Sequence, residues 1–513
     1  MSGSAEEERP PLTAWVFASA LLAVALLMAV GATGYHRDEL YFLEASRHPA
    51  WGYVDQPPLS VALVGLSRIL FGTSLVGLRL FPALADGVMV LLTGMVAREF
   101  GGDRFAQILA SLAVAVSPIL IAGHVAGPTI YDLLAWVLVS FLVLRILRGG
   151  DARAWLLIGL AVGVALVNKE TILLLVGGLA LGFVLNRHWW IFKSPWLWIG
   201  AALAVAIWSP VLVWESQNGW PTLAMSRNLQ REHSGFEFVL TFVPIQLLLP
   251  GWWVAPVWIA GFWALLRAPA YRRFRAFAIA YATGFVLLLV LIPDRPYYVA
   301  GLYPALLAAG APIAGEVIAG TRRFLSTRPP RLRLVWRSRV RAFGFVLVVG
   351  LLFLPLSLPV LPPSVLADVP LQALNYNLGE VVGWPRFVRI VAGVVRSLPP
   401  SEQAGVVILT DNYGEAGAID RFGPELGLPP ASSGHNSYWL WGPPRASAST
   451  RGTTVTVGFS RPYLLGRFSR VTLAARIDNG LGVENDEQGQ PVWICRELRA
   501  PWPVLWPGLK QFG

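Results

Sequence analysis

The sequence is poor in cysteine and in charged residues, and both shortages narrow the class of protein. Its 513 residues include one cysteine, Cys495, so a framework of disulfide bonds within the chain is excluded. Only 14% of the residues are charged, whereas 55% are hydrophobic. This balance is typical of membrane proteins with many spans rather than of soluble domains. The sequence also shows no internal repeat and no histidine spacing of the kind that binds a metal ion.

Acidic residues are few as well, and the chain carries a formal net charge of +11. Its arginines and lysines do not form a single basic surface of the kind that binds nucleic acid. They occur mainly in short runs between apolar segments, and the longest run, 320–341, holds eight arginines. Such runs are typical of cytoplasmic loops. We therefore expect membrane lipids around the chain and no nucleic-acid partner. The acidic start lacks a cleavage site, which predicts that the first apolar segment stays as an anchor.

Apolar windows long enough to cross a hydrocarbon layer of about 30 Å predict an α-helical, polytopic fold with about eleven transmembrane helices. The long window 238–266 contains Pro250-Gly251 near its middle, which predicts a kinked helix or a re-entrant pair. The expected spans are 13–33, 76–97, 105–122, 129–147, 154–168, 170–185, 195–214, 238–266, 276–293, 298–319 and 342–361.

The loop charges predict the orientation of these spans. The positive-inside rule places the arginine-rich loops in the cytoplasm and, with an odd number of spans, the N-terminus too. We then expect a membrane domain over 1–361, with an outer loop at 34–75, and a small extracytoplasmic α/β domain over 362–513. In that tail, strands are predicted at 405–410, 453–459 and 492–498 and a short helix at 415–423.

The segment Gly34–Pro58 is too polar to continue the first span and too rich in ionisable and aromatic residues for a simple connector. It holds the adjacent acids Asp38 and Glu39 and a third acid, Asp55. Two helices lying in the membrane surface are expected here, one over 39–48 with Asp38 as its N-cap and one over 59–71. Together they would cover the outer membrane face.

Further ionisable residues are predicted at the outer ends of the spans, where such groups are costly unless they are used. Asp86 follows Arg79 by one heptad, so we expect it to be a structural partner of Arg79 or of another cation. All of these residues map to one membrane face and indicate one cavity. The set comprises Asp38, Glu39, Arg79, Asp86, His124, Asp132, Lys169, Glu170, Arg295, Tyr297 and Tyr298.

The balance of charges in this cavity favours sugar transfer from a lipid phosphate. Arginine and lysine bind phosphate strongly, and a carboxylate beside an acceptor hydroxyl can act as a general base. A glycosidase would need a second carboxyl group to protonate the leaving oxygen. A phosphate leaving group is already stable as an anion, so one base and several cations suffice.

Several motifs together resemble the GT-C glycosyltransferases over roughly residues 1–320. They resemble most closely the bacterial members of the protein O-mannosyltransferase (family 39) and lipid A aminoarabinose transferase (family 83) group. The motifs are the tyrosine-flanked Asp38-Glu39 pair, PPL at 57–59, Phe71-Gly72, Thr129-x-x-Asp132 with Trp136, Asn168-Lys169, NGWPT at 218–222 and Arg295-Pro-Tyr-Tyr with Tyr303-Pro304.

The resemblance implies an inverting transferase with a polyprenyl-phosphate-linked sugar as donor and a hydroxyl of a protein, lipid or glycan as acceptor. It implies Asp38 as catalytic base, Glu39 as its neighbour in the acceptor site and Asp132 as a second acid. No cofactor is required, and a divalent cation held by Asp38 and Asp132 is left open. The tail differs from the β-trefoil of eukaryotic relatives. The residues expected to bind substrate are Tyr35, Tyr41, Asp55, Arg79, Lys169, Arg295 and Tyr298.

Plainer interpretations stand beside these. Asp38 and Asp132 could each cap a helix, Lys169 could be an interface anchor, and Arg295 could belong to an aromatic belt with its tyrosines. The main alternative function is a transporter or flippase of lipid-linked sugars. Transporters tend to place polar residues near the bilayer midplane, often within inverted repeats. The ionisable residues of this chain are instead expected at one membrane face, which favours an enzyme. Tail residues could bind the acceptor or cap loops: Asp411, Asn412, Glu415 and His435.

Overall fold

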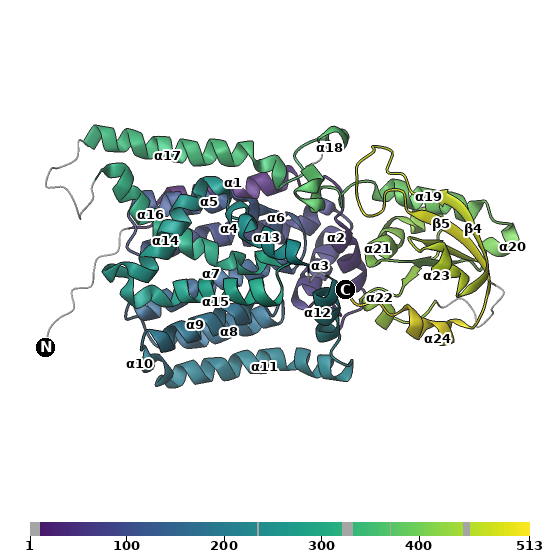
Figure 1. The fold of residues 1–513 in the computed structure, drawn as a ribbon, viewed down its shortest axis with the longest axis horizontal. Helices are drawn as coiled ribbons and strands as arrows, with labels where there is room; N and C mark the ends of the chain where they lie inside the picture. The colour runs from purple at the N-terminus through teal and green to yellow at the C-terminus, as the bar shows by residue number, and fades with distance from the viewer. Residues whose placement is uncertain (1–10, 233–234, 321–331, 370, 445–451) are drawn as a thin grey trace.

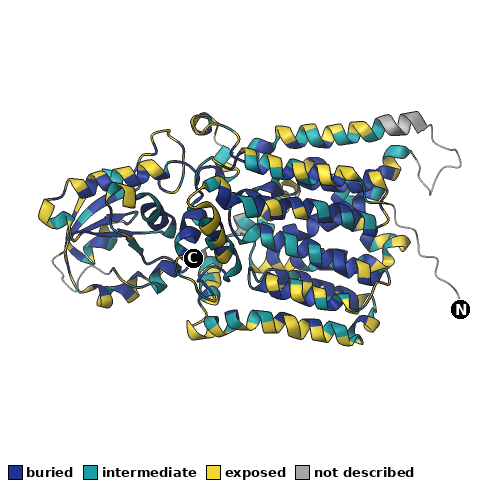
Figure 2. Ribbon diagram, turned by 180° about the vertical axis from the view of Figure 1, so that it is seen from behind, coloured by how far each residue is buried: buried dark blue, intermediate teal, exposed yellow. Residues whose placement is uncertain are grey.

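The computed structural model describes two parts, a long bundle of helices and a smaller part that contains a β-sheet at one end of the bundle (Figure 1). In the helix bundle, exposed residues lie mainly on the outer helices, whereas the central helices are mostly buried (Figure 2). Part of the arginine-rich 320–341 loop lies outside the described residues. Those described are 11–232, 235–320, 332–369, 371–444 and 452–513.

The bundle is made of apolar helices, as the composition predicts. By length and composition, five of the described helices can cross a membrane, or seven if each of two bent pairs forms one span; four further apolar helices are shorter. The chain is therefore a helical membrane protein with several spans, and the number eleven stays a prediction. The main helices are α1 (Ala14–Ala29), α4 (Leu75–Glu99), α5 (Arg104–Ala115), α6 (Ile121–His124), α7 (Pro128–Leu147), α8 (Ala154–Leu166), α9 (Ile172–Leu185), α11 (Pro195–Gln217), α13 (Phe236–Leu248), α14 (Ala255–Arg267), α15 (Arg275–Leu291), α16 (Tyr303–Ala319) and α17 (Leu332–Leu352).

Two of the expected spans are broken, each at a residue that cannot continue a helix. The segment predicted over 238–266 bends by 67° between α13 and α14, where Gly251 adopts a φ of +94° that favours glycine. The segment predicted over 105–122 bends by 53° after α5, because Pro118 starts a new turn that leads into α6.

Small residues let neighbouring helices approach closely, which is the usual basis of packing inside a membrane. Helices α9 and α15 illustrate this. A Cβ atom added to Gly178 or Gly182 of α9 would lie 2.7 Å and 2.6 Å from the Cα atoms of Ala280 and Ala276 in α15. The two helices are therefore held side by side along their length.

The two helices expected in the membrane surface are present at the end of the bundle that faces the sheet. Helix α3 (Leu59–Phe71) has the predicted bounds, but α2 runs over Arg37–Ala45 rather than 39–48. The prediction of Asp38 as the N-cap is wrong, because His36 is the cap. The His36 ring accepts from the Asp38 backbone N–H, and the Glu39 carboxylate accepts from the His36 backbone N–H. Asp38 is thus free of a capping role.

The C-terminal part is a small α/β domain with a five-stranded mixed sheet in the order β2-β1-β3-β5-β4. β1 pairs in parallel with β2 and β3, whereas β5 is antiparallel to β3 and β4. Three strands and the helix α21 (Tyr413–Phe422) match predicted segments, while β2 and β4 were not predicted. The strands are β1 (Val407–Thr410), β2 (Ala431–Ser433), β3 (Thr454–Val457), β4 (Phe468–Arg476) and β5 (Pro491–Leu498).

Candidate active site

The candidate site lies where the helix bundle meets the sheet domain. Helices α2 and α21 lie side by side at this junction (Figure 1). Gly417 of α21 permits the approach, since a Cβ atom there would lie 2.7 to 2.9 Å from backbone atoms of Leu40 and Tyr41. The sheet domain is therefore placed against the helix that carries the acidic pair.

Asp38 presents its carboxylate at this junction. The Tyr413 hydroxyl donates to Asp38 Oδ1 at 2.8 Å, and the second oxygen, Oδ2, lies 3.8 Å from His36 Nδ1. The side chain is 38% exposed, so a hydroxyl group could reach it. The Arg37 guanidinium lies 5.3 Å from the centre of the Tyr413 ring. Asp38 is thus an accessible carboxylate whose orientation is fixed by a residue of the sheet domain.

Asp55 forms the second acidic member of this cluster. The Tyr41 hydroxyl donates to Asp55 Oδ1 at 2.7 Å, and the Tyr41 and Tyr413 rings lie 4.8 Å apart. Burial and, to a smaller extent, the negative charge of Asp38 raise the pKa of Asp55, and the Tyr41 hydrogen bond lowers it; the net result is a pKa of about 7. Asp38 and Asp55 are therefore neighbouring carboxyl groups in unequal surroundings.

Glu39 and Arg79 form a fully buried ion pair, which corrects two sequence predictions. Arg79 donates from Nε to Glu39 Oε1 at 2.9 Å and from Nη2 to Oε2 at 2.7 Å. The backbone N–H groups of His36 and Ala126 also donate to Glu39. Burial alone would raise the pKa of Glu39, but Arg79 and these hydrogen bonds lower it. Glu39 is fully buried, and Arg79 is 1% exposed with both its Nε and Nη2 groups bonded to Glu39, so neither side chain is free to contact a substrate.

Asp86 also differs from its prediction, because Arg79 pairs with Glu39 instead. Both carboxylate oxygens of Asp86 are buried without a hydrogen-bond partner, and so are both ring nitrogens of His124. Residue Gly123 makes room for the Asp86 side chain, since a Cβ atom there would lie 2.9 Å from Asp86 Cβ. Asp86 and His124 therefore lie in the membrane part and outside the ion pair.

The cationic side of the site is formed by the ends of the membrane helices. Lys169 Nζ lies 4.7 Å from the centre of the Tyr298 ring and 5.4 Å from that of Tyr297. Arg295, two residues before Tyr297, has its Nε 3.2 Å from Asp294 Oδ2. Cation–π contacts of this kind hold an ammonium group in place without neutralising its charge. Lys169 therefore stays a positive charge near two tyrosine rings.

Tyr376, which sequence reasoning did not select, connects the acidic and cationic sides. Tyr376 is 64% exposed, but charged groups on both sides act on its pKa: Asp38 and Tyr297 raise it, whereas Arg37 and Arg295 lower it. Asp38 and Arg295 thus act on the same phenol ring. Both clusters therefore lie near Tyr376.

Asp132 is bonded through both carboxylate oxygens. Trp136 Nε1 donates to Oδ1 at 3.1 Å and the Thr171 hydroxyl donates to Oδ2 at 2.6 Å. The Asn168 amide donates to the Pro128 carbonyl of the same helix at 2.8 Å. Gly127 is the N-cap of α7, so Asp132 does not cap the helix. Asp132 instead fixes the 168–171 turn that presents Lys169.

Two of the tyrosines expected to bind substrate form hydrogen bonds within the protein instead. The Tyr35 hydroxyl donates to the Thr73 carbonyl at 2.6 Å, and its ring contacts Phe422 of the sheet domain. Tyr41 is fully buried and bonded to Asp55. Both tyrosines support the junction, and neither offers a free hydroxyl.

The sheet domain contributes Tyr413 to the candidate site, a residue that the sequence analysis did not select. From the sequence we selected four tail residues as candidates for acceptor binding: Asp411, Asn412, Glu415 and His435. Tyr413 was not among them. Asn412 and Glu415 form the capping box of α21, as the plainer interpretation holds. The His435 ring lies 4.7 Å from the Tyr413 ring, and its nitrogens have no hydrogen-bond partner. Tyr413 could have been found only by knowing that this helix packs on α2.

The segment NGWPT at 218–222 connects another loop to the candidate site. Thr222, at the start of α12 (Pro221–Glu232), donates to Glu215 Oε1 at 2.5 Å and lies 3.3 Å from the Val54 carbonyl. This fixes α12 against the Gly34–Pro58 segment. Within the described residues, no three His, Cys, Asp or Glu side chains are grouped so as to hold a metal ion. Asp38 and Asp132, the suggested cation pair, are bonded to different partners.

Comparisons with known proteins agree with this architecture. The family model of dolichyl-phosphate-mannose-protein mannosyltransferases matches residues 55–214, which is less than half of the chain. No match was found among curated protein sequences. The crystal structure of ArnT from Cupriavidus metallidurans bound to undecaprenyl phosphate has a TM-score of 0.58 at 16% identity, covering 94% of this chain and 98% of that one.

Further solved structures show the same or a weaker likeness. The apo state of the same ArnT gives a TM-score of 0.58 at 15% identity, with 94% and 97% of the two chains covered. The arabinofuranosyltransferase AftD from Mycobacteria gives 0.46 at 16% identity, with 94% and 40% covered. The ArnT likeness extends over both the bundle and the sheet domain. This chain is therefore a multi-span membrane protein with the GT-C fold.

Proposed function

We propose that the protein is an inverting glycosyltransferase that moves a sugar from a polyprenyl-phosphate-linked donor to a hydroxyl group of an acceptor. The observation that carries this proposal is the presence of an accessible carboxylate, Asp38, and of the cations Lys169 and Arg295 at the same end of the helix bundle. The ArnT structure that shares the fold was solved with undecaprenyl phosphate, which supports a lipid phosphate as the carrier of the sugar.

The reaction that fits these groups is a single displacement. Asp38 accepts the proton of the acceptor hydroxyl while its oxygen attacks the anomeric carbon, and the bond between that carbon and the phosphate oxygen breaks. Lys169 and Arg295 stabilise the negative charge that develops on the departing lipid phosphate. Asp132 contributes by fixing the turn that carries Lys169. Because the attack and the departure occur on opposite faces of the carbon, the configuration inverts.

The surroundings of the site suit a donor with a long apolar tail. Helix α3 exposes Ile69 and Leu70, which are 76% and 56% accessible, next to the junction. Such a surface fits a prenyl chain held in the plane of the membrane. We propose that the site opens to the outer face, that the acceptor is a protein, a lipid or a glycan, and that the 362–513 domain completes its binding site.

The test is sugar transfer in liposomes, from polyprenyl-phosphate-linked sugars to a membrane extract, with wild type and Asp38→Asn. General-base catalysis contributes about 10² to 10⁴ in rate, so Asp38→Asn should lose activity by that factor while still binding the lipid donor. Glu44→Gln is the matched control, since Glu44 is on the same helix and pairs instead with Arg47 and His48.

The outcomes separate the alternatives. Equal transfer by wild type and Asp38→Asn would exclude Asp38 as the base. If neither protein transfers sugar but labelled lipid-linked sugar crosses the bilayer, the protein is a transporter instead.

A further inference from the structure

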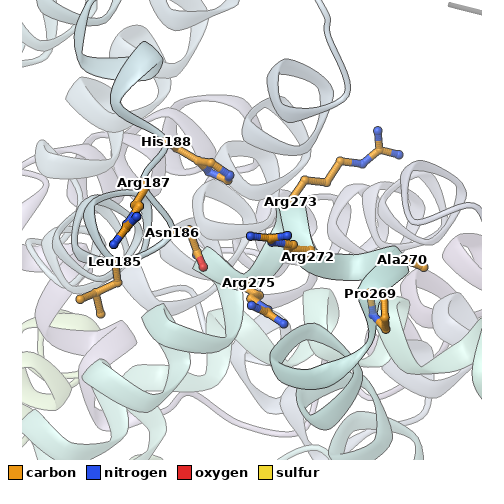
Figure 3. A pocket seen from close by; sticks show the side chains of 9 residues that line it. All are labelled: Leu185, Asn186, Arg187, His188, Pro269, Ala270, Arg272, Arg273 and Arg275. Atoms are coloured by element: carbon orange, nitrogen blue, oxygen red, sulfur yellow. The ribbon is translucent and has the colours of Figure 1, made fainter.

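A second cluster of cationic side chains lies at the end of the bundle farthest from the sheet domain. It lines a cavity of about 610 Å³ that no residue of the candidate active site borders. One wall is the segment that follows α9, and the other is the segment that leads into α15 (Figure 3). None of the residues that line the cavity is acidic. They are Leu185, Asn186, Arg187, His188, Pro269, Ala270, Arg272, Arg273 and Arg275.

The cavity is separated from the candidate active site by the length of helices α9 and α15. Helix α9 begins next to the Lys169 turn and ends at Leu185, and α15 begins at Arg275 and ends a few residues before Arg295. At 1.5 Å per residue, helices of this length span roughly 20 to 25 Å. The two cation clusters therefore occupy opposite ends of one tightly packed helix pair.

Cationic side chains lie on both walls of the cavity. Figure 3 shows Arg187 and His188 on one side and Arg272 on the other, whereas the Arg273 guanidinium extends away. Among the residues that the structure describes, no carboxylate pairs with Arg187, Arg272 or Arg275. Arg275 Nε and His188 Nδ1 are also buried without a hydrogen-bond partner. The positive charges of Arg187, Arg272 and Arg275 are thus gathered with no carboxylate paired to them among the residues that the structure describes.

The position of the cavity also matches a membrane surface. The short helix α10 (Trp189–Phe192) directly follows its first wall, and its two tryptophans are 52% and 48% exposed. Exposed tryptophans are typical of the headgroup level of a bilayer. Basic pockets between membrane helices at this level bind the headgroups of anionic lipids.

We propose that this cavity is a binding site for a phosphate-bearing anion. Arginine forks match phosphate oxygens in pairs, and the cavity has the volume of an ordinary ligand site. A phospholipid headgroup and a soluble phosphate both present this chemistry. The bound anion links the end of α9 to the start of α15. This site is independent of the proposed transferase reaction.

The experiment uses the full chain purified in detergent. Native mass spectrometry measures how much phosphatidylglycerol, compared with phosphatidylcholine, stays bound to wild type and to the double variant Arg187→Gln, Arg272→Gln. The control is Arg145→Gln, Arg153→Gln, which removes the same charge from exposed arginines at the same end of the bundle but outside the cavity. A second arm measures the shift in melting temperature caused by inorganic phosphate and by pyrophosphate.

The expected result is at least tenfold weaker retention of phosphatidylglycerol by the cavity variant, with the control equal to wild type. If the soluble phosphates alone stabilise the protein, and only the cavity variant loses that effect, the site holds a soluble anion. Equal behaviour of the cavity and control variants in both arms would overturn the proposal. The single variant Arg272→Gln replaces the double variant should the latter fail to fold.

Discussion

Asp38 and Asp55 carry the same chemical group but differ in their surroundings, and this difference predicts a pH dependence. The pKa of Asp55 is raised to about 7, chiefly by burial, so Asp55 loses its proton as the pH rises through neutrality. The new negative charge lies beside the reacting groups, where it stabilises the positive charge that develops as the acceptor hydroxyl attacks and gives up its proton. We expect the transfer rate to rise through about pH 7 in wild type and to lack that step in Asp55→Asn.

The same raised pKa has a consequence for stability, with a definite sign. Folding favours protonated Asp55, whereas the unfolded chain releases this proton near pH 4. The contribution of Asp55 to stability is therefore present below about pH 4 and is lost as the pH rises to about 7. Melting curves of wild type and Asp55→Asn in detergent should converge at low pH and separate above it. Parallel curves at all pH values would contradict the assignment.

Tyr413 acts on Asp38 from another domain, and its hydroxyl can be removed without changing the ring. A hydrogen bond to a charged group is worth about 1.5 to 3 kcal/mol, so Tyr413→Phe should lower kcat by roughly 10- to 100-fold. KM for the lipid donor should change little, because the hydroxyl positions the base and not the phosphate. Tyr463→Phe serves as the control, since Tyr463 stacks on Phe459 in the same domain. An unchanged kcat in Tyr413→Phe would show that Asp38 needs no positioning.

Glu39 and Arg79 lie in a buried pair, so their replacement should affect folding. Removing one partner of a buried ion pair leaves the other charge uncompensated and costs about 3 to 5 kcal/mol. Arg79→Met should therefore lower the unfolding midpoint strongly. The matched control is Arg386→Gln, which breaks the exposed pair with Asp478 and should cost less than about 1 kcal/mol. Similar losses in both variants would contradict a special role for the buried pair.

At the scale of the elements, local sequence patterns predicted those helices and strands whose bounds are set by nearby residues. Helix α3 was expected over 59–71 and has those bounds, since Pro58 precedes it and Gly72 ends it with a φ of +63°. β1 and β5 also fall in predicted segments, because short apolar runs between turns favour strands. The two edge strands, β2 and β4, were not predicted. β4 is largely exposed and β2 has only three residues, so neither produces a strong apolar pattern in the sequence.

The pairing of ionisable residues could not be predicted in the same way. The heptad spacing of Arg79 and Asp86 does place them on one face of α4, but the partner of Arg79 is Glu39, 40 residues earlier. Tyr413 lies 375 residues from Asp38. Such pairs depend on which distant elements pack against each other, and the sequence of one element does not indicate which element that is.

The contact between α2 and α21 gives a test at this scale. Gly417→Leu would place side-chain atoms against the backbone of α2, which cannot yield as a flexible side chain does. We expect α21 to be displaced and transfer to be lost while the sheet domain stays folded. Gly393→Leu is the control, because a Cβ atom at Gly393, in another helix of the domain, meets nothing within 4 Å. Retained transfer in Gly417→Leu would show that the junction is not needed.

At the scale of the whole molecule, the two ends of the bundle are chemically different. One end carries the carboxylates, Lys169 and the sheet domain, and the other carries the arginine-lined cavity beside α10 (Figure 1). Positive charge gathers on the cytoplasmic side of membrane proteins. The arginine-rich end is therefore predicted to face the cytoplasm, and the sheet domain the outside.

Cysteine labelling tests this orientation with little background, since Cys495 is fully buried. Ser401→Cys places a thiol on the exposed α20 (Pro400–Gln403) of the sheet domain, and Lys193→Cys places one after α10 at the opposite end. A membrane-impermeant maleimide applied to intact cells should label Ser401→Cys and leave Lys193→Cys unmodified until the membrane is permeabilised. The reverse pattern would place the candidate active site in the cytoplasm, where the acceptor would have to be a cytoplasmic hydroxyl.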